Sequence, residues 1–138
     1  PATAVTATES IALSWPTRLW DDFSTRYDGF STETYKTVGK RLTELNNRVV
    51  EMATLQVEQR IACALLRLIN QVGKKVSNGI EINFPLTRQD LSEMTGTTLH
   101  TVSRTLSAWE KQGTIKSGRK KITICDPHQL VILTSAPL

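Results

Sequence analysis

Residues 86–113 read "LTRQDLSEMTGTTLHTVSRTLSAWEKQG" and decide the fold, because they carry the start and stop signals of two successive short helices. Thr87 can cap a helix whose third position is Asp90, which is a variant of the capping box. Gly96 ends that helix, since glycine tolerates a backbone with positive φ. One of the two threonines that follow it then caps a second helix. Two helices joined over so tight a turn predict a helix–turn–helix.

The second helix of this pair is predicted to be amphipathic. Apolar residues recur at helical spacing and should face the core. They are Leu99, Val102, Leu106 and Trp109. The opposite face is polar and lacks a carboxylate, so it should face solvent or a partner. Its members are His100, Ser103, Arg104, Ser107 and Lys111.

Two short β runs follow the helix pair. Residues 114–118 ("TIKSG") and 119–124 ("RKKITI") alternate as strands and are predicted to form a hairpin that turns at Ser117-Gly118, with basic residues around the turn. Residues 80–84 ("IEINF") supply a third strand, and residues 73–79 ("GKKVSNG") before it read as a loop. A helix–turn–helix followed by a basic hairpin is a winged helix.

The distribution of charge favours a polyanionic partner. The chain carries 17 Lys and Arg against 13 Asp and Glu, for a formal net charge of +4. Between Glu93 and Asp126 the only carboxylate is Glu110. Six basic residues share that stretch: Arg104, Lys111, Lys116, Arg119, Lys120 and Lys121. Basic charge without acids suits a phosphate backbone, although it is also typical of a solvated surface.

An outward helix with hydroxyls, one guanidinium and no carboxylate can enter the major groove of DNA without repelling phosphates. Arg104 is suited to bind a guanine through O6 and N7, and His100 and Ser103 share its face. Polar groups near the two helix N-termini and basic groups of the hairpin are predicted to hold phosphates. They are Thr87, Arg88, Gln89, Thr98, Thr101, Lys116, Arg119 and Lys120. The alternative is a winged helix that contacts protein and does not bind DNA.

The longest helical pattern runs from about Ser31 to Leu55 and carries a narrow apolar stripe. The stripe repeats as the inner positions of a coiled coil do, for nearly three heptads. Its members are Tyr35, Val38, Leu42, Leu45, Val49 and Met52. The stripe either packs on its own domain or pairs with its copy in a second subunit, and its narrowness favours the homodimer. Residues 56–72 predict a further helix with the broader apolar face of a compact core.

The beginning of the chain alternates like β-strands, and we expect strands at Thr3–Thr8 and Ile11–Trp15. Two strands cannot bury a core alone, so they should lean on the following helices or on sequence outside this chain. The chain has no initiator Met and no signal peptide, and a strand at its first residues suggests that a domain precedes it.

Several classes of protein are not expected. The sequence shows no Ser/His/Asp set, paired carboxylates, metal-ligand spacing or phosphate loop, so it does not indicate an enzyme. Cys63 and Cys125 lie far apart without a CxxC partner, which fits a reducing cytoplasm, and Cys63 should be buried among apolar neighbours. No apolar run has the length of a membrane helix.

Residues 86–113 resemble the DNA-binding motif of the Crp/Fnr family, bacterial regulators related to the cyclic-AMP receptor protein. The resemblance covers nearly the whole chain and implies a mainly α fold with a small β part. Residues 1–28 would be the C-terminal remnant of a β-roll sensor domain of the cyclic-nucleotide-binding type. Residues 29–55 would be the long dimerisation helix, and residues 56–138 the winged helix–turn–helix DNA-binding domain.

The resemblance implies a cytoplasmic homodimer that regulates transcription from a near-palindromic operator. Arg104 matches the family arginine that reads a half-site guanine, and Ser103 matches the serine of the branch that responds to oxygen and nitrogen oxides. The family usually carries a glutamate, which reads cytosine, where this chain has His100. We therefore expect a TTG-like half-site with an altered or relaxed choice at the adjacent inner base pair, unless His100 faces phosphate or solvent.

The effector is expected to differ from cyclic AMP. Leu45-Asn46 stands where the cyclic-AMP-binding member has a Thr-Ser pair that touches the nucleotide, and Leu45 offers no hydroxyl. The "LHTVSR" form of residues 99–104 is most similar to regulators of denitrification that respond to nitric oxide. Haem in a sensor domain outside this chain is therefore the candidate cofactor, and RNA polymerase is a candidate partner.

Overall fold

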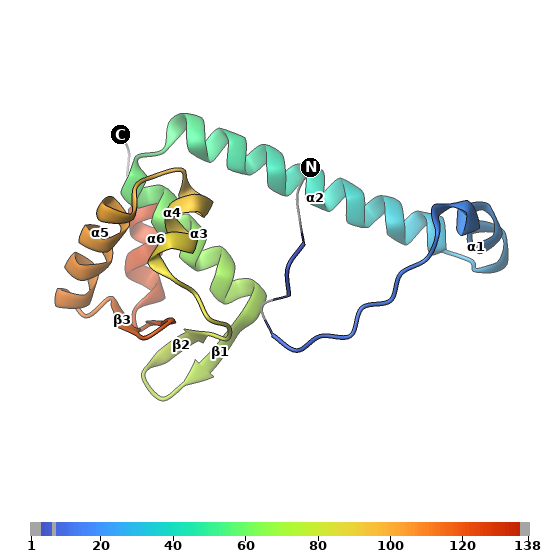
Figure 1. Ribbon diagram of the computed structural model, residues 1–138. Helices are drawn as coiled ribbons and strands as arrows, with labels where there is room; N and C mark the ends of the chain where they lie inside the picture. Colours follow the sequence, from blue (N-terminus) through green and yellow to red (C-terminus); the bar gives the residue numbers. More distant parts are fainter. Residues whose placement is uncertain (1–3, 7, 136–138) are drawn as a thin grey trace. The chain divides into compact units, whose positions relative to one another are not determined.

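The computed structural model describes residues 4–6 and 8–135, and contacts divide the chain into two units. The first unit is Pro1–Val50 and the second is Glu51–Leu138. The secondary structure is mainly helical, with one small four-stranded antiparallel sheet (Figure 1). This composition of elements confirms the predicted fold class, apart from the strands expected at the start of the chain.

Short helices packed through aromatic rings begin the first unit. Its elements are η1 (Thr17–Leu19), α1 (Trp20–Arg26) and the long α2 (Phe30–Thr54), which continues into the second unit. Gly29 adopts a φ of 84° between α1 and α2, a conformation that glycine takes without strain. The rings of Trp20 and Phe23 lie 5.3 and 5.6 Å from the ring of Phe30, centroid to centroid. These rings hold α1 against the start of α2.

The predicted strand at Ile11–Trp15 is wrong. Residues 8–16 are extended or bent without strand pairing, and so are residues 4–6. Residues 3 and 7 of the other predicted strand, Thr3–Thr8, lie outside the described residues. Ile11 is 96% exposed and Leu13 76%, so no apolar surface covers either side chain. A strand pair without a third strand or a covering helix has little to stabilise it, which explains why alternation alone misled the prediction.

Helix α2 confirms the predicted helix of residues 31–55 and is 25 residues long. Its apolar stripe is exposed along its whole length, from 48% at Met52 to 67% at Leu42. The other members are Tyr35, Val38, Leu45 and Val49. Despite this length, neither α2 nor another helix of the described ranges is apolar enough to cross a membrane.

The second unit is a winged helix–turn–helix with a sheet at one end. Its elements after the end of α2 are α3 (Val57–Val72), β1 (Gly73–Val76), β2 (Gly79–Ile82), α4 (Arg88–Thr95), α5 (Leu99–Lys111), β3 (Ile115–Gly118), β4 (Lys121–Ile124) and α6 (Pro127–Ser135). The strands pair in the order β1-β2-β4-β3, which makes β3 an edge strand. The sheet includes both the predicted hairpin and the predicted third strand.

Two details of the sheet correct the sequence prediction. Residues 73–76, expected in a loop, form β1 and pair with β2, so that Lys74 lies opposite Glu81. The hairpin of β3 and β4 turns at Arg119-Lys120, two residues later than expected. Lys120 takes a φ of 58° there, in the left-handed region that residues other than glycine rarely adopt.

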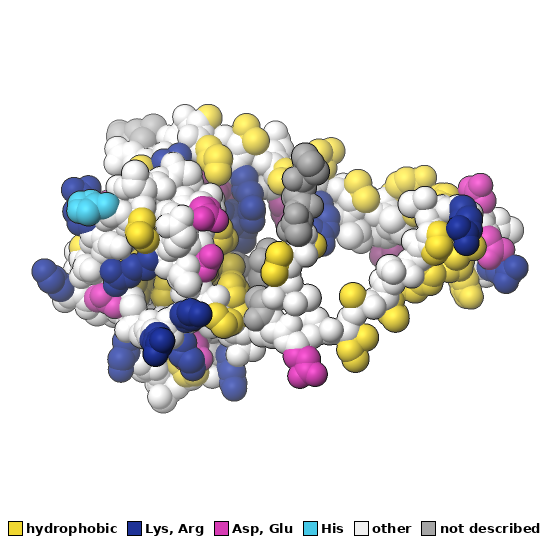
Figure 2. All heavy atoms as spheres, viewed as in Figure 1, with side chains coloured by type: hydrophobic (Ala, Val, Ile, Leu, Met, Phe, Trp, Pro, Cys, Tyr) yellow, Lys and Arg dark blue, Asp and Glu magenta, His cyan; other side chains and the backbone are white. Residues whose placement is uncertain are grey.

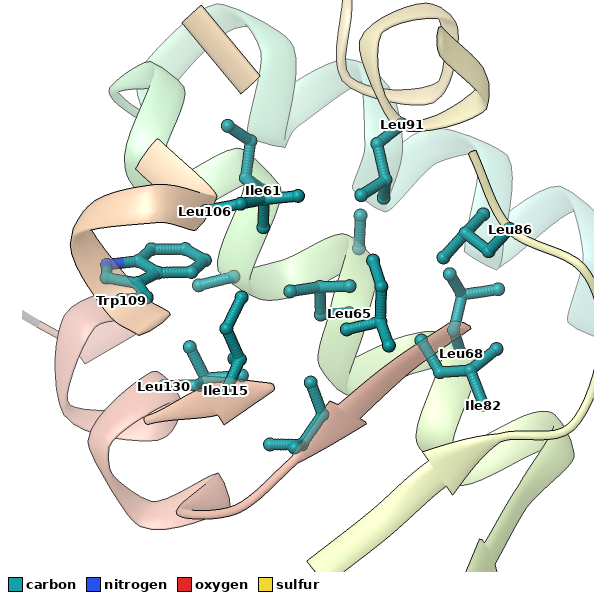
Figure 3. Close-up of a cluster of buried hydrophobic side chains, with 14 of the residues drawn as sticks. Ile61, Leu65, Leu68, Ile82, Leu86, Leu91, Leu106, Trp109, Ile115 and Leu130 are labelled. Atoms are coloured by element: carbon teal, nitrogen blue, oxygen red, sulfur yellow. The ribbon is translucent and has the colours of Figure 1, made fainter. Parts of the chain in front are cut away.

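The core of the second unit lies between α3, α5, α6 and the sheet (Figure 3). Ile61 and Leu65 of α3, Leu106 of α5 and Leu130 of α6 are fully buried in it. Three members of the predicted α5 stripe are buried, whereas Leu99 is 47% exposed. Leu99 is the first residue of α5 and so projects from its end. Cys63 is half-buried, and its burial raises the pKa of the thiol.

Candidate nucleic-acid interface

A reciprocal cap fixes the start of α4. Asp90 donates its backbone N–H to the Thr87 hydroxyl oxygen at 3.1 Å, and the Thr87 hydroxyl and backbone N–H donate to Asp90 Oδ2 at 2.7 and 2.8 Å. These hydrogen bonds, with a smaller contribution from the Lys120 ammonium, hold the pKa of the Asp90 carboxyl below its ordinary value. The predicted capping box is therefore confirmed. The Thr87 hydroxyl serves this cap in the structure.

The turn between α4 and α5 depends on one glycine. Gly96 adopts φ 60° and ψ 41°, the left-handed conformation expected after a helix C-terminus. Its backbone N–H and that of Thr97 both donate to the carbonyl of Ser92. Thr98 then caps α5, because its hydroxyl oxygen accepts from the backbone N–H of Thr101 at 3.2 Å. This turn sets the position of α5 relative to α4.

The outward face of α5 presents the three predicted base-reading residues. His100 and Arg104 are exposed and Ser103 is half-buried, while Val102 and Leu106 on the opposite face are fully buried. Within the described part of the chain, neither His100 nor Arg104 makes a side-chain hydrogen bond or an ion pair. The guanidinium of Arg104 is thus available to an external ligand.

The start of α4, part of α5 and the hairpin line an open cavity of about 380 Å³. Four of the predicted phosphate-binding residues line it: Thr87, Arg88, Gln89 and Lys120. Lys121, which the prediction omitted, lines it as well. The other four, Thr98, Thr101, Lys116 and Arg119, do not line this cavity. Figure 2 shows Lys and Arg side chains gathered over the α5 and hairpin side of this unit.

One carboxylate connects the helix pair to the hairpin. Glu110, in the last turn of α5, accepts a hydrogen bond from the backbone N–H of Ser117 at 2.9 Å through Oε1. Its Oε2 lies 3.9 Å from Nη2 of Arg88 at the start of α4. The sequence singled out Glu110 as the only acid of its stretch and did not predict these contacts.

The helix–turn–helix seen in the structure agrees with the match of this sequence to a known protein family. Residues 59–132 match the family model of the Crp-like helix-turn-helix domain. The chain belongs to the Crp/Fnr family. This matched region begins in α3 and ends in α6, so it contains the helix pair, the hairpin and the cavity between them.

Two curated relatives align with nearly the whole chain. Electron transport regulator A of Shewanella oneidensis is 24% identical over 124 residues, which are 90% of this chain and 50% of the relative. A CRP-like cAMP-activated global transcriptional regulator of Mycobacterium tuberculosis is 23% identical over 129 residues, which are 94% of this chain and 58% of the relative. Both names are those of regulators and not of enzymes. The chain spans half or a little more of the length of these relatives.

A solved structure supports the same fold. A mutant of CooA from Carboxydothermus hydrogenoformans superposes with a TM-score of 0.78 at 24% sequence identity. The superposition covers 86% of this chain and 55% of CooA. At this level of identity the likeness supports the fold and says nothing of the ligand.

Proposed function

We propose that this chain is the dimerising and DNA-binding part of a transcriptional regulator that binds a near-palindromic operator as a homodimer. The observation that carries the proposal is the outward face of α5, where the side chains of Arg104 and His100 are exposed and form no hydrogen bond or ion pair with the described residues. An unpaired arginine on the second helix of a helix–turn–helix is placed to donate two hydrogen bonds to guanine O6 and N7.

Contacts to the DNA backbone would surround the base-reading helix. The cavity at the start of α4 combines Arg88, Lys120 and Lys121 with the N-terminus of a helix, an arrangement that favours an anion. Thr98 and Thr101 lie at the N-terminus of α5, and Lys116 and Arg119 are exposed on the hairpin. We assign phosphate binding to the cavity residues, to the N-terminus of α5 and to the hairpin, because base contacts alone supply little of the affinity for DNA.

The exposed stripe of α2 supports a homodimer. Large apolar side chains that are half to two-thirds exposed at coiled-coil spacing leave an apolar seam open to water. A second copy of α2 would bury that seam, since both helices carry the same pattern. Two copies of the winged helix–turn–helix would then bind two half-sites of a near-palindromic operator.

The half-site and the effector extend the proposal. We propose a TTG-like half-site in which Arg104 reads the guanine, and a response of the whole regulator to nitric oxide or redox state. No group of three His, Cys, Asp or Glu in the described ranges could hold a metal ion. We propose that a haem of this regulator would belong to a sensor domain outside this chain. RNA polymerase in a bacterial cytoplasm is the proposed partner of the bound regulator.

Fluorescence anisotropy with a labelled TTG-containing palindrome and a scrambled duplex tests the DNA-binding function. The wild type should prefer the palindrome, and Arg104→Ala should lose about 1–3 kcal/mol of that preference while it still binds both duplexes. Arg18→Ala, an equal charge change in η1, serves as the control. Absence of salt-dependent binding to either duplex would favour the alternative, a winged helix that contacts protein.

A further inference from the structure

Glu110 is an acid in an unfavourable place. It is the only carboxylate between Glu93 and Asp126, in a stretch whose other charged side chains are all Lys or Arg. It also lies in the last turn of α5, where the partial negative charge of the helix C-terminus disfavours a second negative charge. In a protein that binds a polyanion, a carboxylate here repels the ligand. A structural role of Glu110 would offset this repulsion.

Its two contacts join three elements. Through Oε1, Glu110 of α5 accepts from the backbone N–H of Ser117 in β3 at 2.9 Å. Through Oε2, it faces the Arg88 guanidinium at the start of α4, at 3.9 Å. One side chain of the base-reading helix α5 thus contacts both β3, the first strand of the hairpin, and the start of α4, which lines the phosphate-binding cavity.

The bond to Ser117 fixes the free edge of the hairpin. β3 pairs with β4 on one side and is the last strand of the sheet on the other. The Glu110 carboxylate therefore satisfies an edge N–H that would otherwise need water or another strand. On the other side of the turn, the carbonyl of Lys120 accepts from the backbone N–H of Leu86 at 3.1 Å. These two hydrogen bonds hold the hairpin close to its basic turn.

The contact with Arg88 is looser. The 3.9 Å separation exceeds hydrogen-bond length, and the side chains of Arg88 and Glu110 are 39% and 31% exposed. Such a pair contributes little to stability, so the Arg88 guanidinium can exchange its partner at little cost. A phosphate oxygen, which can accept two short charge-assisted hydrogen bonds, can then replace the carboxylate as the partner of Arg88.

We propose that Glu110 is a positioning residue for DNA binding. It holds the basic hairpin against α5 through the hydrogen bond from Ser117, and its looser contact with Arg88 gives way to a phosphate. The proposal rests on the proposed DNA-binding function. It predicts that the hydrogen-bonding capacity of residue 110 matters for binding, whereas its negative charge does not favour binding.

Two variants separate these properties. Glu110→Gln keeps an oxygen that can accept from Ser117 and removes the charge, while Glu110→Ala removes both. Affinity for the palindrome and for the scrambled duplex is measured by anisotropy over a range of salt concentrations. Glu110→Ala should weaken binding to both duplexes about tenfold and lower the slope of log K against log salt by about one, as when one phosphate contact is lost. Glu110→Gln should bind at least as tightly as the wild type, with an undiminished slope.

A third variant tests whether the effect passes through the hairpin. In a background of Arg119→Ala and Lys120→Ala, the added Glu110→Ala substitution should no longer change the slope, because the contacts it positions are already gone. Far-ultraviolet circular dichroism checks folding of each variant, and Glu110→Gln remains informative if Glu110→Ala does not fold. An unchanged slope in Glu110→Ala, or weakened binding in Glu110→Gln, overturns the proposal. Either result leaves intact the operator preference of the wild type, which the proposed function requires.

Discussion

The guanidinium of Arg67 on α3 forms a bidentate ion pair with the carboxylate of Glu51 near the end of α2. Nη1 lies 2.9 and 3.3 Å from the two carboxylate oxygens, and Nη2 lies 3.3 Å from one of them. The two side chains are only 23% and 22% exposed. The pair therefore links the last turn of α2 to the middle of α3 across the corner at Leu55-Gln56.

Removal of the Glu51 carboxylate should destabilise the second unit. Glu51→Ala leaves the Arg67 guanidinium half-buried without its partner, and such a loss costs about 1–3 kcal/mol. Urea denaturation followed by circular dichroism measures the change. The matched control is Glu33→Ala, which removes the ion pair between Glu33 and Lys36. The side chains of that pair are 71% and 67% exposed, so this substitution should lower the free energy of unfolding by less than about 0.5 kcal/mol. Equal losses in the two variants would show that the Glu51 pair has no special role.

The cap of α4 should make stability depend on pH. The folded state lowers the pKa of Asp90, so its contribution is present above the unfolded pKa, about 4, and disappears as pH falls through the lower folded value. Asp90→Asn should therefore be less stable than the wild type at neutral pH, and the difference should shrink below about pH 4. Thermal melting at a series of pH values measures it. Thr87→Ala, which removes the hydroxyl donor to Asp90, should also reduce the change in stability between neutral and acidic pH. A stability difference between Asp90→Asn and the wild type that does not change with pH would contradict this account.

A charge in the α2 stripe should separate the subunits. Leu42 is 67% exposed at the centre of the stripe, and Leu42→Glu would place two carboxylates against each other in a dimer. We expect a monomer by sedimentation equilibrium, and affinity for a palindrome reduced by about tenfold or more, because the two half-sites no longer bind together. Asn47→Glu, exposed on the opposite side of α2, is the control and should stay dimeric. A wild type that is already monomeric at micromolar concentration would contradict the homodimer.

Local signals predicted the second unit well. The cap at Thr87 and Asp90, the left-handed Gly96 and the cap at Thr98 each depend on residues within four positions of one another, so their spacing alone was enough. β1 was missed because three of its four residues are exposed and show no alternation, and its pairing with β2 supplies the order instead.

Contacts between distant residues could not be predicted in this way. The sequence marked Glu110 as an isolated acid, but its approach to Arg88 depends on how α5 crosses α4. The strand at Ile11–Trp15 failed for the opposite reason, since its alternation was real but the described chain supplies no neighbouring strand. Leu99 fits the apolar period of α5 and is nevertheless half-exposed, because helical periodicity does not say where a helix leaves the core.

Residue 100 should set how strictly the operator is read next to the guanine. His100 is exposed one turn before Arg104 on the same face of α5, and an imidazole can donate as well as accept, so it cannot reproduce the preference of a carboxylate for cytosine N4. Selection from an operator with randomised half-sites should return a fixed guanine and a relaxed or altered inner base pair. His100→Glu should sharpen that position toward cytosine by about 1–3 kcal/mol and leave the guanine unchanged. If the wild type already selects the inner base as strongly as His100→Glu, His100 does not read this position and faces phosphate or solvent instead.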